Sequence, residues 1–85
     1  MVTYIFSNLN TEGERSAIQL GKDLDLRKVG YELIDADSAR GISLCELYDV
    51  MARPAVVLVG PNGSEIQKWD HQWPSASEIA YQYFV

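Results

Sequence analysis

The stretch MARPAVVLVGPNG, residues 51–63, decides the fold. Its segment AVVLV (55–59) is apolar at every position, which is typical of a central strand covered on both faces. The turn signal GPNG (60–63) and the alternating SEIQKW (64–69) predict a second strand that returns as a hairpin. Pro54 cannot donate to a sheet ladder, so we expect it at the very start of the strand, where no ladder hydrogen bond is lost.

The preceding residues alternate between strand and helix patterns. The segments VTYIFS (2–7) and YELID (31–35) predict two strands. Helical spacing predicts a helix over 12–28, stopped by Gly30, and another over 44–51. The stretch DADSARG (35–41) breaks the pattern and is predicted to be a loop.

A third helix is predicted in the final stretch, SASEIAYQYFV. The residues expected to face the core are Ala17, Leu20, Gly21 and Leu24 in the first helix, Leu44, Leu47, Tyr48 and Met51 in the second, and Ala76, Ala80, Tyr83 and Phe84 in the third.

All three predicted helices start with the same short motif. A hydroxyl residue three positions before a glutamate forms a capping box, in which both side chains satisfy backbone amides at the helix start. The three matches are Thr11 with Glu14, Ser43 with Glu46, and Ser75 with Glu78. Together they support the order β-α-β-α-β-β-α.

Size and composition limit the function classes. The 85 residues suit one domain, spanning 1–85. The net charge of −5 counts against a nucleic-acid partner, because such proteins carry a clustered basic face. A single cysteine, Cys45, excludes an internal disulfide and suits a reducing compartment. Neither a signal peptide nor a membrane span is evident, so we expect a cytoplasmic location and no membrane partner.

The predicted order, together with YDVMARPAVVLVGPNGSEI (48–66), resembles the thioredoxin and glutaredoxin superfamily. The resemblance implies an α/β thioredoxin-like fold, a four-stranded mixed sheet flanked by helices on both faces. It also implies that Pro54 follows a cis peptide bond and opens the central strand. In that family the backbone before this proline pairs with an extended peptide or with glutathione.

One feature of the family is missing from the sequence. Family members carry Cys-x-x-Cys or Cys-x-x-Ser at the start of the first helix, and the positions that match best hold Thr11 and Glu14. Neither side chain can attack a disulfide, so the dithiol mechanism is excluded. The negative charge of Glu12 and Glu14 also weakens anion binding at this helix start, so no glutathione cofactor is expected.

Three residues near the proline are candidates for binding. Arg53 suits a carboxylate or phosphate ligand, although a solvated loop residue is an equal alternative. Trp69 and Trp73 are of the type enriched in binding hot spots, and the resemblance implies that either borders the same groove as Arg53. The structural alternative is that Trp69 packs on the sheet and Trp73 covers the last helix.

The remaining reactive side chains are isolated. His71 has no cysteine or second histidine nearby in the sequence, so no metal site is predicted. Cys45 is the one weak catalytic candidate, and a packing role beside Leu44 is favoured.

Two functions therefore stay open. The first is a non-catalytic module that binds a peptide, a protein or a second copy of itself through Arg53, Pro54, Trp69, Trp73 and Thr11. The alternative is a monothiol or thiol-regulated, glutaredoxin-like protein that uses Cys45 in thiol–disulfide chemistry.

Overall fold

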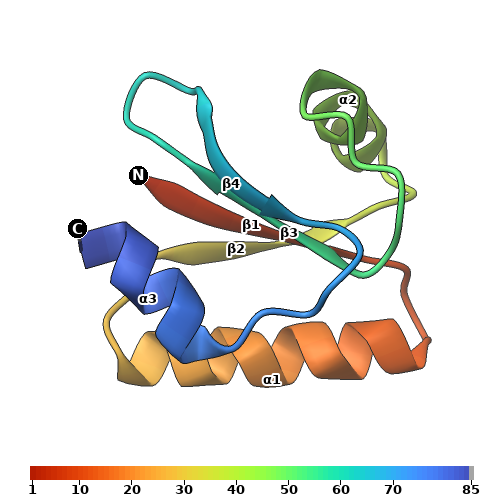
Figure 1. Ribbon diagram of the computed structural model, residues 1–85. Helices are drawn as coiled ribbons and strands as arrows, with labels where there is room; N and C mark the ends of the chain where they lie inside the picture. Colours follow the sequence, from red (N-terminus) through yellow and green to blue (C-terminus); the bar gives the residue numbers. More distant parts are fainter. Residues whose placement is uncertain (85) are drawn as a thin grey trace.

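The computed structural model describes residues 1–84 and has the predicted element order β-α-β-α-β-β-α (Figure 1). The strands are β1 (Val2–Ser7), β2 (Tyr31–Asp35), β3 (Ala55–Val59) and β4 (Glu65–Trp69). The helices are α1 (Glu12–Leu26), α2 (Ala39–Leu47) and α3 (Ala76–Phe84). The predicted order is thereby confirmed, while α2 lies earlier in the chain than the predicted helix over 44–51.

The four strands form one mixed sheet in the order β2-β1-β3-β4. Strand β1 runs parallel to β2, with Ile5 opposite Leu33, and antiparallel to β3, with Ile5 opposite Val56. Strand β4 pairs with β3 in antiparallel fashion, with Trp69 opposite Val56. The central strands are therefore β1 and β3, and β2 and β4 are the edges.

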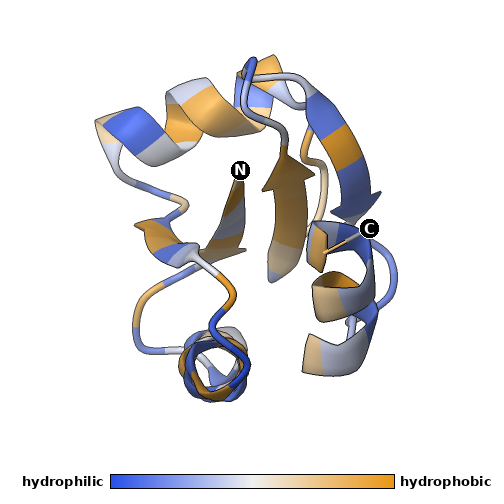
Figure 2. Ribbon diagram, turned by 90° about the vertical axis from the view of Figure 1, so that its left-hand side faces the viewer, coloured by the Kyte–Doolittle hydropathy of each residue, from blue (hydrophilic) through white to orange (hydrophobic). Residues whose placement is uncertain are grey.

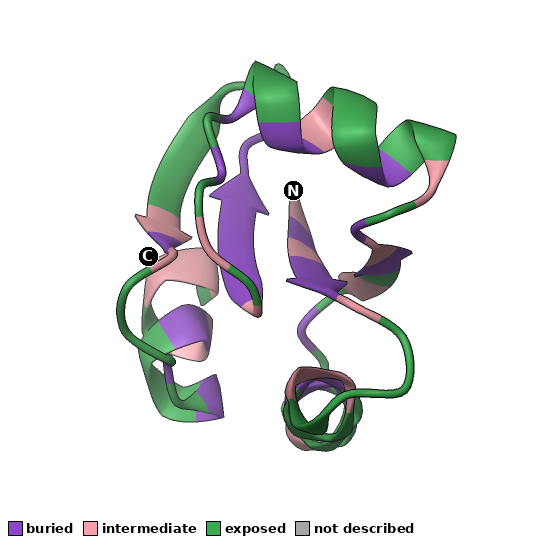
Figure 3. Ribbon diagram, turned by 90° about the vertical axis from the view of Figure 1, so that its right-hand side faces the viewer, coloured by how far each residue is buried: buried purple, intermediate pink, exposed green. Residues whose placement is uncertain are grey.

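Helices cover both faces of this sheet (Figure 1). Helices α1 and α3 lie on one face, where Ile5, Leu24 and Ile79 belong to one apolar cluster. Helix α2 lies on the other face, where Phe6 and Cys45 belong to a second cluster. Strand β3 contributes alternate residues to the two clusters, so all five of its residues are buried (Figures 2 and 3).

Two of the predicted helix caps are confirmed. The Thr11 hydroxyl oxygen accepts a hydrogen bond from the Glu14 backbone amide at 3.3 Å. At α3 the capping box is reciprocal, since Ser75 Oγ accepts from the Glu78 amide and Glu78 Oε1 accepts from the Ser75 amide, both at 3.2 Å. These side chains satisfy backbone amides that a helix start leaves without partners.

The predicted cap at Ser43 is wrong. Helix α2 begins at Ala39, and its N-cap is Ser38, whose Oγ accepts from the Gly41 amide at 2.9 Å. The first turn of α2 therefore lies inside the stretch 35–41 that was predicted to be a loop. Gly41 in the first turn of α2 is a poor helix former, so the sequence pattern did not indicate a helix there. The same glycine allows the close packing of α2 against the end of β2.

Helices α1 and α2 end with the same backbone motif. In α1, Lys28 adopts a left-handed φ of 59°, and the Val29 amide reaches back to the Leu24 carbonyl at 3.0 Å. In α2, Asp49 has φ 54°, and the Val50 amide reaches the Cys45 carbonyl at 2.8 Å. These are Schellman motifs, in which the residue after the turn packs back on the helix. The predicted stop at Gly30 is therefore two residues too late.

Three residues predicted to face the core are exposed instead. Leu47 and Met51 are 69% and 73% exposed, because α2 ends at Leu47 and its buried face runs through Gly41 and Cys45. Phe84 is 64% exposed, and the fully buried apolar residue of α3 is Ile79, which the sequence reading did not select.

The helices are short, the longest being α1 with 15 residues. Within residues 1–84, no helix combines the length and the apolar composition that crossing a membrane requires.

Candidate functional site

The chain enters β3 through the peptide bond between Arg53 and Pro54, which is cis. The ladder with β1 starts one residue later, at Ala55 opposite Phe6. Pro54 therefore stands just outside the hydrogen-bonded part of the strand, where its missing N–H costs no ladder bond. Arg53 is exposed and Pro54 is half-buried.

The start of α1 lies directly against this proline. A Cβ added to Gly13 would come within 3.1 Å of Pro54 Cδ and 3.4 Å of Pro54 Cγ. The absence of a side chain at Gly13 thus permits the close approach of the first helical turn to the proline ring. This contact sets the distance between the helix start and the Arg53–Pro54 backbone.

Two adjoining hollows share Arg53 and Pro54, and we call them together the Arg53–Pro54 groove. The hollow on the helix side is lined by Asn8, Thr11, Glu12, Gly13, Arg53 and Pro54. The hollow on the other side is lined by Ser16, Ala52, Arg53, Pro54, Asp70, His71, Gln72 and Trp73. Four of the five predicted binding residues, namely Thr11, Arg53, Pro54 and Trp73, therefore meet in one place.

Trp69 lies elsewhere. It is the last residue of β4, is 9% exposed, and belongs to the apolar cluster beneath α1 and α3. Its accessible edge lines a different hollow, between β4 and α3. Trp73, which is 39% exposed, is therefore the tryptophan that shares the groove with Arg53. Trp69 instead packs on the sheet, which was the structural alternative.

The side chains of Thr11 and Glu14 are engaged in local hydrogen bonds. Thr11 Oγ1 donates to the Asn8 carbonyl at 2.6 Å while it accepts from the Glu14 amide. Glu14 Oε1 accepts from the Asn10 amide at 3.1 Å. Both residues therefore hold the loop before α1 in shape, and neither supplies a nucleophile to the groove.

Asp70 is a groove residue that sequence reasoning missed. Its side chain is only 11% exposed, and its Oδ1 lies 3.6 Å from Nε2 of the exposed His71. Asp70 directly follows Trp69, which is paired with Val56, so it reaches the groove from the end of the neighbouring strand. The available sequence signal was a charged residue, Asp70, directly after the strand that is predicted to pair with the one Pro54 opens.

The groove carries charges of both signs. Arg53 supplies the one guanidinium among its lining residues, and Glu12 and Asp70 supply carboxylates from either side. Such a groove is suited to a partner that presents both hydrogen-bond donors and acceptors along its length, as the main chain of an extended peptide does. Among residues 1–84, no cluster of three histidine, cysteine, aspartate or glutamate side chains has a metal-binding arrangement.

Cys45 is not among the lining residues of this groove. It is 6% exposed and packs with Phe6, Ile34 and Val57 in the cluster on the α2 face of the sheet, whereas α1 covers the opposite face. The packing role that the sequence favoured for Cys45 agrees with this position. A reaction of the thiol with a protein disulfide would require the α2 layer to open.

Two shifted pKa values belong to the α2 side of the molecule. Burial raises the pKa of Tyr48, helped by the nearby Tyr4 and Glu65. The hydrogen bond with Glu32 raises the pKa of Arg40, whose guanidinium also lies 5.6 Å from the centre of the Tyr4 ring. Both groups lie outside the Arg53–Pro54 groove.

Comparison with solved structures supports the architecture. Thioredoxin 1 from the thermophilic eubacterium Thermosipho africanus TCF52B superposes with a TM-score of 0.72, at 18% identity, over 96% of this chain and 89% of that protein. A structure described as a malarial protein superposes with a TM-score of 0.73, at 16% identity, over 99% and 97% of the two chains. No family model and no curated protein sequence matches the chain. The chain therefore has the thioredoxin-like fold, with Pro54 at the entry to its central strand.

Proposed function

We propose that this domain is a non-catalytic binding module that holds an extended segment of a peptide or protein in the Arg53–Pro54 groove. The observation that carries the proposal is the position of the Arg53–Pro54 backbone between two adjoining hollows. A partner strand laid across this backbone has side-chain space on either side. Such main-chain pairing gives affinity, and the flanking hollows give specificity.

The chemistry of the groove favours binding over reaction. Thr11 and Glu14 stand where members of the resembled family carry their nucleophilic cysteine and its partner. Here both side chains are engaged in hydrogen bonds that shape the start of α1. The single cysteine is buried in the other layer of the molecule. The lining of the groove includes one arginine, one exposed tryptophan, one histidine and two carboxylates. Arg and Trp are enriched among residues that carry binding energy.

Selection from a library of short, unconstrained displayed peptides on the immobilised domain tests the proposal. Enriched peptides are then titrated calorimetrically against the wild type and against Arg53→Ala. We expect the substitution to weaken binding about 10-fold, as truncation of an anchoring arginine typically does. Backbone amide shifts on binding should be concentrated at Gly13, Ala52 and Trp73.

Lys22→Ala provides the matched control. Lys22 is exposed on α1 and is not among the lining residues of the groove, but its removal changes the net charge by the same amount. We expect its affinity to stay within about twofold of wild type, since distant surface charges are screened. Failure to enrich any peptide, or equal affinities of Arg53→Ala and wild type, would exclude this groove as the site. Sedimentation of the domain alone reports whether a second copy is the partner.

A further inference from the structure

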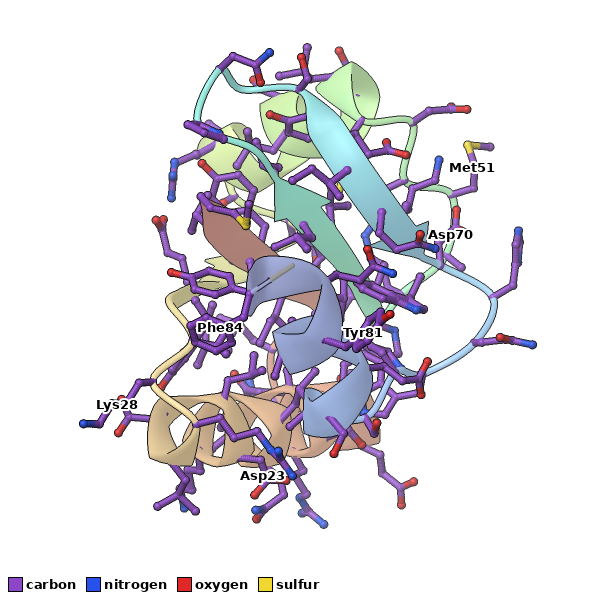
Figure 4. The ribbon with its side chains drawn as sticks, turned by 60° about the vertical axis from the view of Figure 1, so that its left-hand side comes forward. Asp23, Lys28, Met51, Asp70, Tyr81 and Phe84 are labelled. Carbon is purple, nitrogen blue, oxygen red and sulfur yellow. The ribbon has the colours of Figure 1, made fainter. Side chains whose placement is uncertain are left out.

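A second groove lies between β4 and α3, and it is independent of the Arg53–Pro54 groove. Its lining residues are Gln67, Trp69, Ser77, Glu78, Tyr81 and Gln82, none of which lines the other groove. Figure 4 shows Tyr81 projecting from the flank of α3, beyond the end of β4 that leads to Asp70. We call this hollow the β4–α3 groove.

The groove runs beside an unpaired strand edge. Strand β4 is the last strand of the sheet and pairs only with β3, so its outer backbone groups have no strand partner in residues 1–84. Glu65, Ile66 and Gln67 are all exposed along this edge. Edge strands of this kind accept an added strand from another chain, and alternate side chains of that strand then enter neighbouring pockets.

The wall of the groove is aromatic and exposed. Tyr81 is 69% exposed although it is a large aromatic residue, and Trp69 contributes the accessible edge of its buried ring. The face of a tyrosine ring attracts ammonium and guanidinium groups, because the ring quadrupole places negative potential there, so Tyr81 is the groove residue suited to a cation. The long aliphatic stems of lysine and arginine also pack well on such surfaces.

The charge around the groove is negative. Glu78 is the one charged lining residue, and only its Oε1 is used in the capping bond to the Ser75 amide. The groove borders the first turn of α3 at Ser77 and Glu78 and the later turn at Tyr81 and Gln82, so the negative sign comes from the Glu78 carboxylate and not from the helix dipole. Arg27 lies in a neighbouring hollow on the far side of Ser77, together with Asp23.

The one cation of β4 is held on the opposite face of the sheet. Lys68 Nζ donates to the carbonyl oxygens of Tyr48 and Asp49, at 3.2 Å and 2.9 Å, at the end of α2. It therefore neither neutralises the β4–α3 groove of its own chain nor is free to enter the groove of a second copy paired through β4.

We propose that the β4–α3 groove binds an extended cationic segment of a partner protein, which adds to the β4 edge and places one lysine or arginine side chain between Tyr81, Trp69 and Glu78. The main chain of the segment completes the hydrogen bonding of the sheet edge. Its cationic head lies near the free oxygen of the Glu78 carboxylate, and its stem packs on Tyr81. This site is separate from the Arg53–Pro54 groove and stands without it.

A capped synthetic peptide of alternating threonine and valine with one central lysine is the probe. It is titrated into the isotope-labelled domain while backbone amides and the Trp69 indole N–H are followed by NMR. We expect shifts along β4 and at Tyr81, slower hydrogen exchange of β4 amides, and at least about 10-fold weaker binding of the same peptide with central glutamate. Binding should weaken as salt is raised.

Two variants distinguish specific binding at this site from non-specific binding of the peptide to the domain. Glu78→Gln removes the charge but keeps the capping box, because glutamine also serves at that position, and we expect about threefold weaker binding. Tyr81→Ala alters an exposed side chain, and we expect about fivefold weaker binding. Arg53→Ala is the control and should bind the probe as the wild type does. Absent binding, equal affinity for the lysine and glutamate peptides, unchanged affinity of both groove variants, or shifts confined to the Arg53–Pro54 groove would each overturn the proposal.

Discussion

Gly41 in the first turn of α2 lies directly against the backbone of Asp35 at the end of β2. A Cβ at Gly41 would overlap the Asp35 carbonyl oxygen and lie 2.9 Å from its carbonyl carbon and 3.0 Å from the Ala36 Cα. All of these neighbours are backbone atoms, which cannot rotate away. The seating of α2 on the sheet therefore depends on the absence of a side chain at this position.

Gly41→Ala should destabilise the domain. In an exposed helix the same change stabilises by about 0.5–1 kcal/mol, because glycine is the poorer helix former. Here the added methyl group must displace backbone, and overpacking of this kind costs about 1–3 kcal/mol. Urea unfolding followed by circular dichroism measures the difference in free energy of unfolding. A variant more stable than wild type would contradict the packing of α2 on β2.

Ser38 and Ser43 should respond differently to alanine. Ser38 Oγ caps α2, so Ser38→Ala is expected to lower the free energy of unfolding by about 1 kcal/mol. Ser43 lies inside the helix and is exposed, so Ser43→Ala should be neutral or slightly stabilising. Chemical denaturation of the two variants side by side makes the comparison. The reverse order would restore the helix start predicted from the sequence.

Tyr48→Phe should weaken the link between α2 and the β3–β4 turn. The Tyr48 hydroxyl donates to the Gly63 carbonyl at 2.8 Å, and its loss should cost about 0.5–1.5 kcal/mol. Tyr81→Phe removes a hydroxyl from an exposed tyrosine and serves as the control, with an expected change near zero. Thermal unfolding at neutral pH measures both. Equal melting temperatures of wild type and Tyr48→Phe would show that the bond contributes nothing.

The same tyrosine predicts a dependence on alkaline pH. Burial raises the pKa of Tyr48 above its ordinary value of 10.0, so the folded chain holds the phenolic proton more tightly than the unfolded chain. Its contribution is complete below pH 10.0 and is lost as the pH rises further, because the unfolded chain ionises first. The stability advantage of wild type over Tyr48→Phe should therefore shrink above that pH. An advantage that grows with pH would indicate a lowered pKa.

Cys45 should be protected from alkylation in the folded domain. Its side chain is 6% exposed within the cluster on the α2 face, so iodoacetamide reaches it only after local or global opening. We expect the folded-state rate to be at least about 100-fold below the rate in denaturant. Intact-mass spectrometry over time gives both rates. Comparable rates in the two states would support the monothiol alternative.

The sequence predicted the strands and two of the helix starts because their signals are local. The apolar run 55–59, the hairpin turn before β4, and the hydroxyl–glutamate pairs at Thr11 and Ser75 each act within a few residues. Local chemistry also placed Pro54 outside the strand ladder. The start of α2 was missed because its determinant, the contact of Gly41 with Asp35, joins two elements.

The candidate site was predictable only in part. Arg53, Pro54, Trp73 and Thr11 were identified from the sequence, and the structure brings them to one groove. Asp70 was missed, whereas its neighbour in the sequence, Trp69, was predicted to share the groove with Arg53. The alternation of a strand sends Trp69 to one face of β4, and the strand ends before Asp70, so adjacent residues serve different surfaces.

By itself the sequence determined the order of the elements and the presence of a single cysteine, because these depend on local patterns and on which atoms the chain contains. Tertiary structure alone decided which helical faces are buried, that Cys45 lies inside, and that the two tryptophans line different grooves. The physical reason is that burial and proximity depend on the register of the sheet and on the fit of each helix against it. Those quantities arise from residues far apart in the chain.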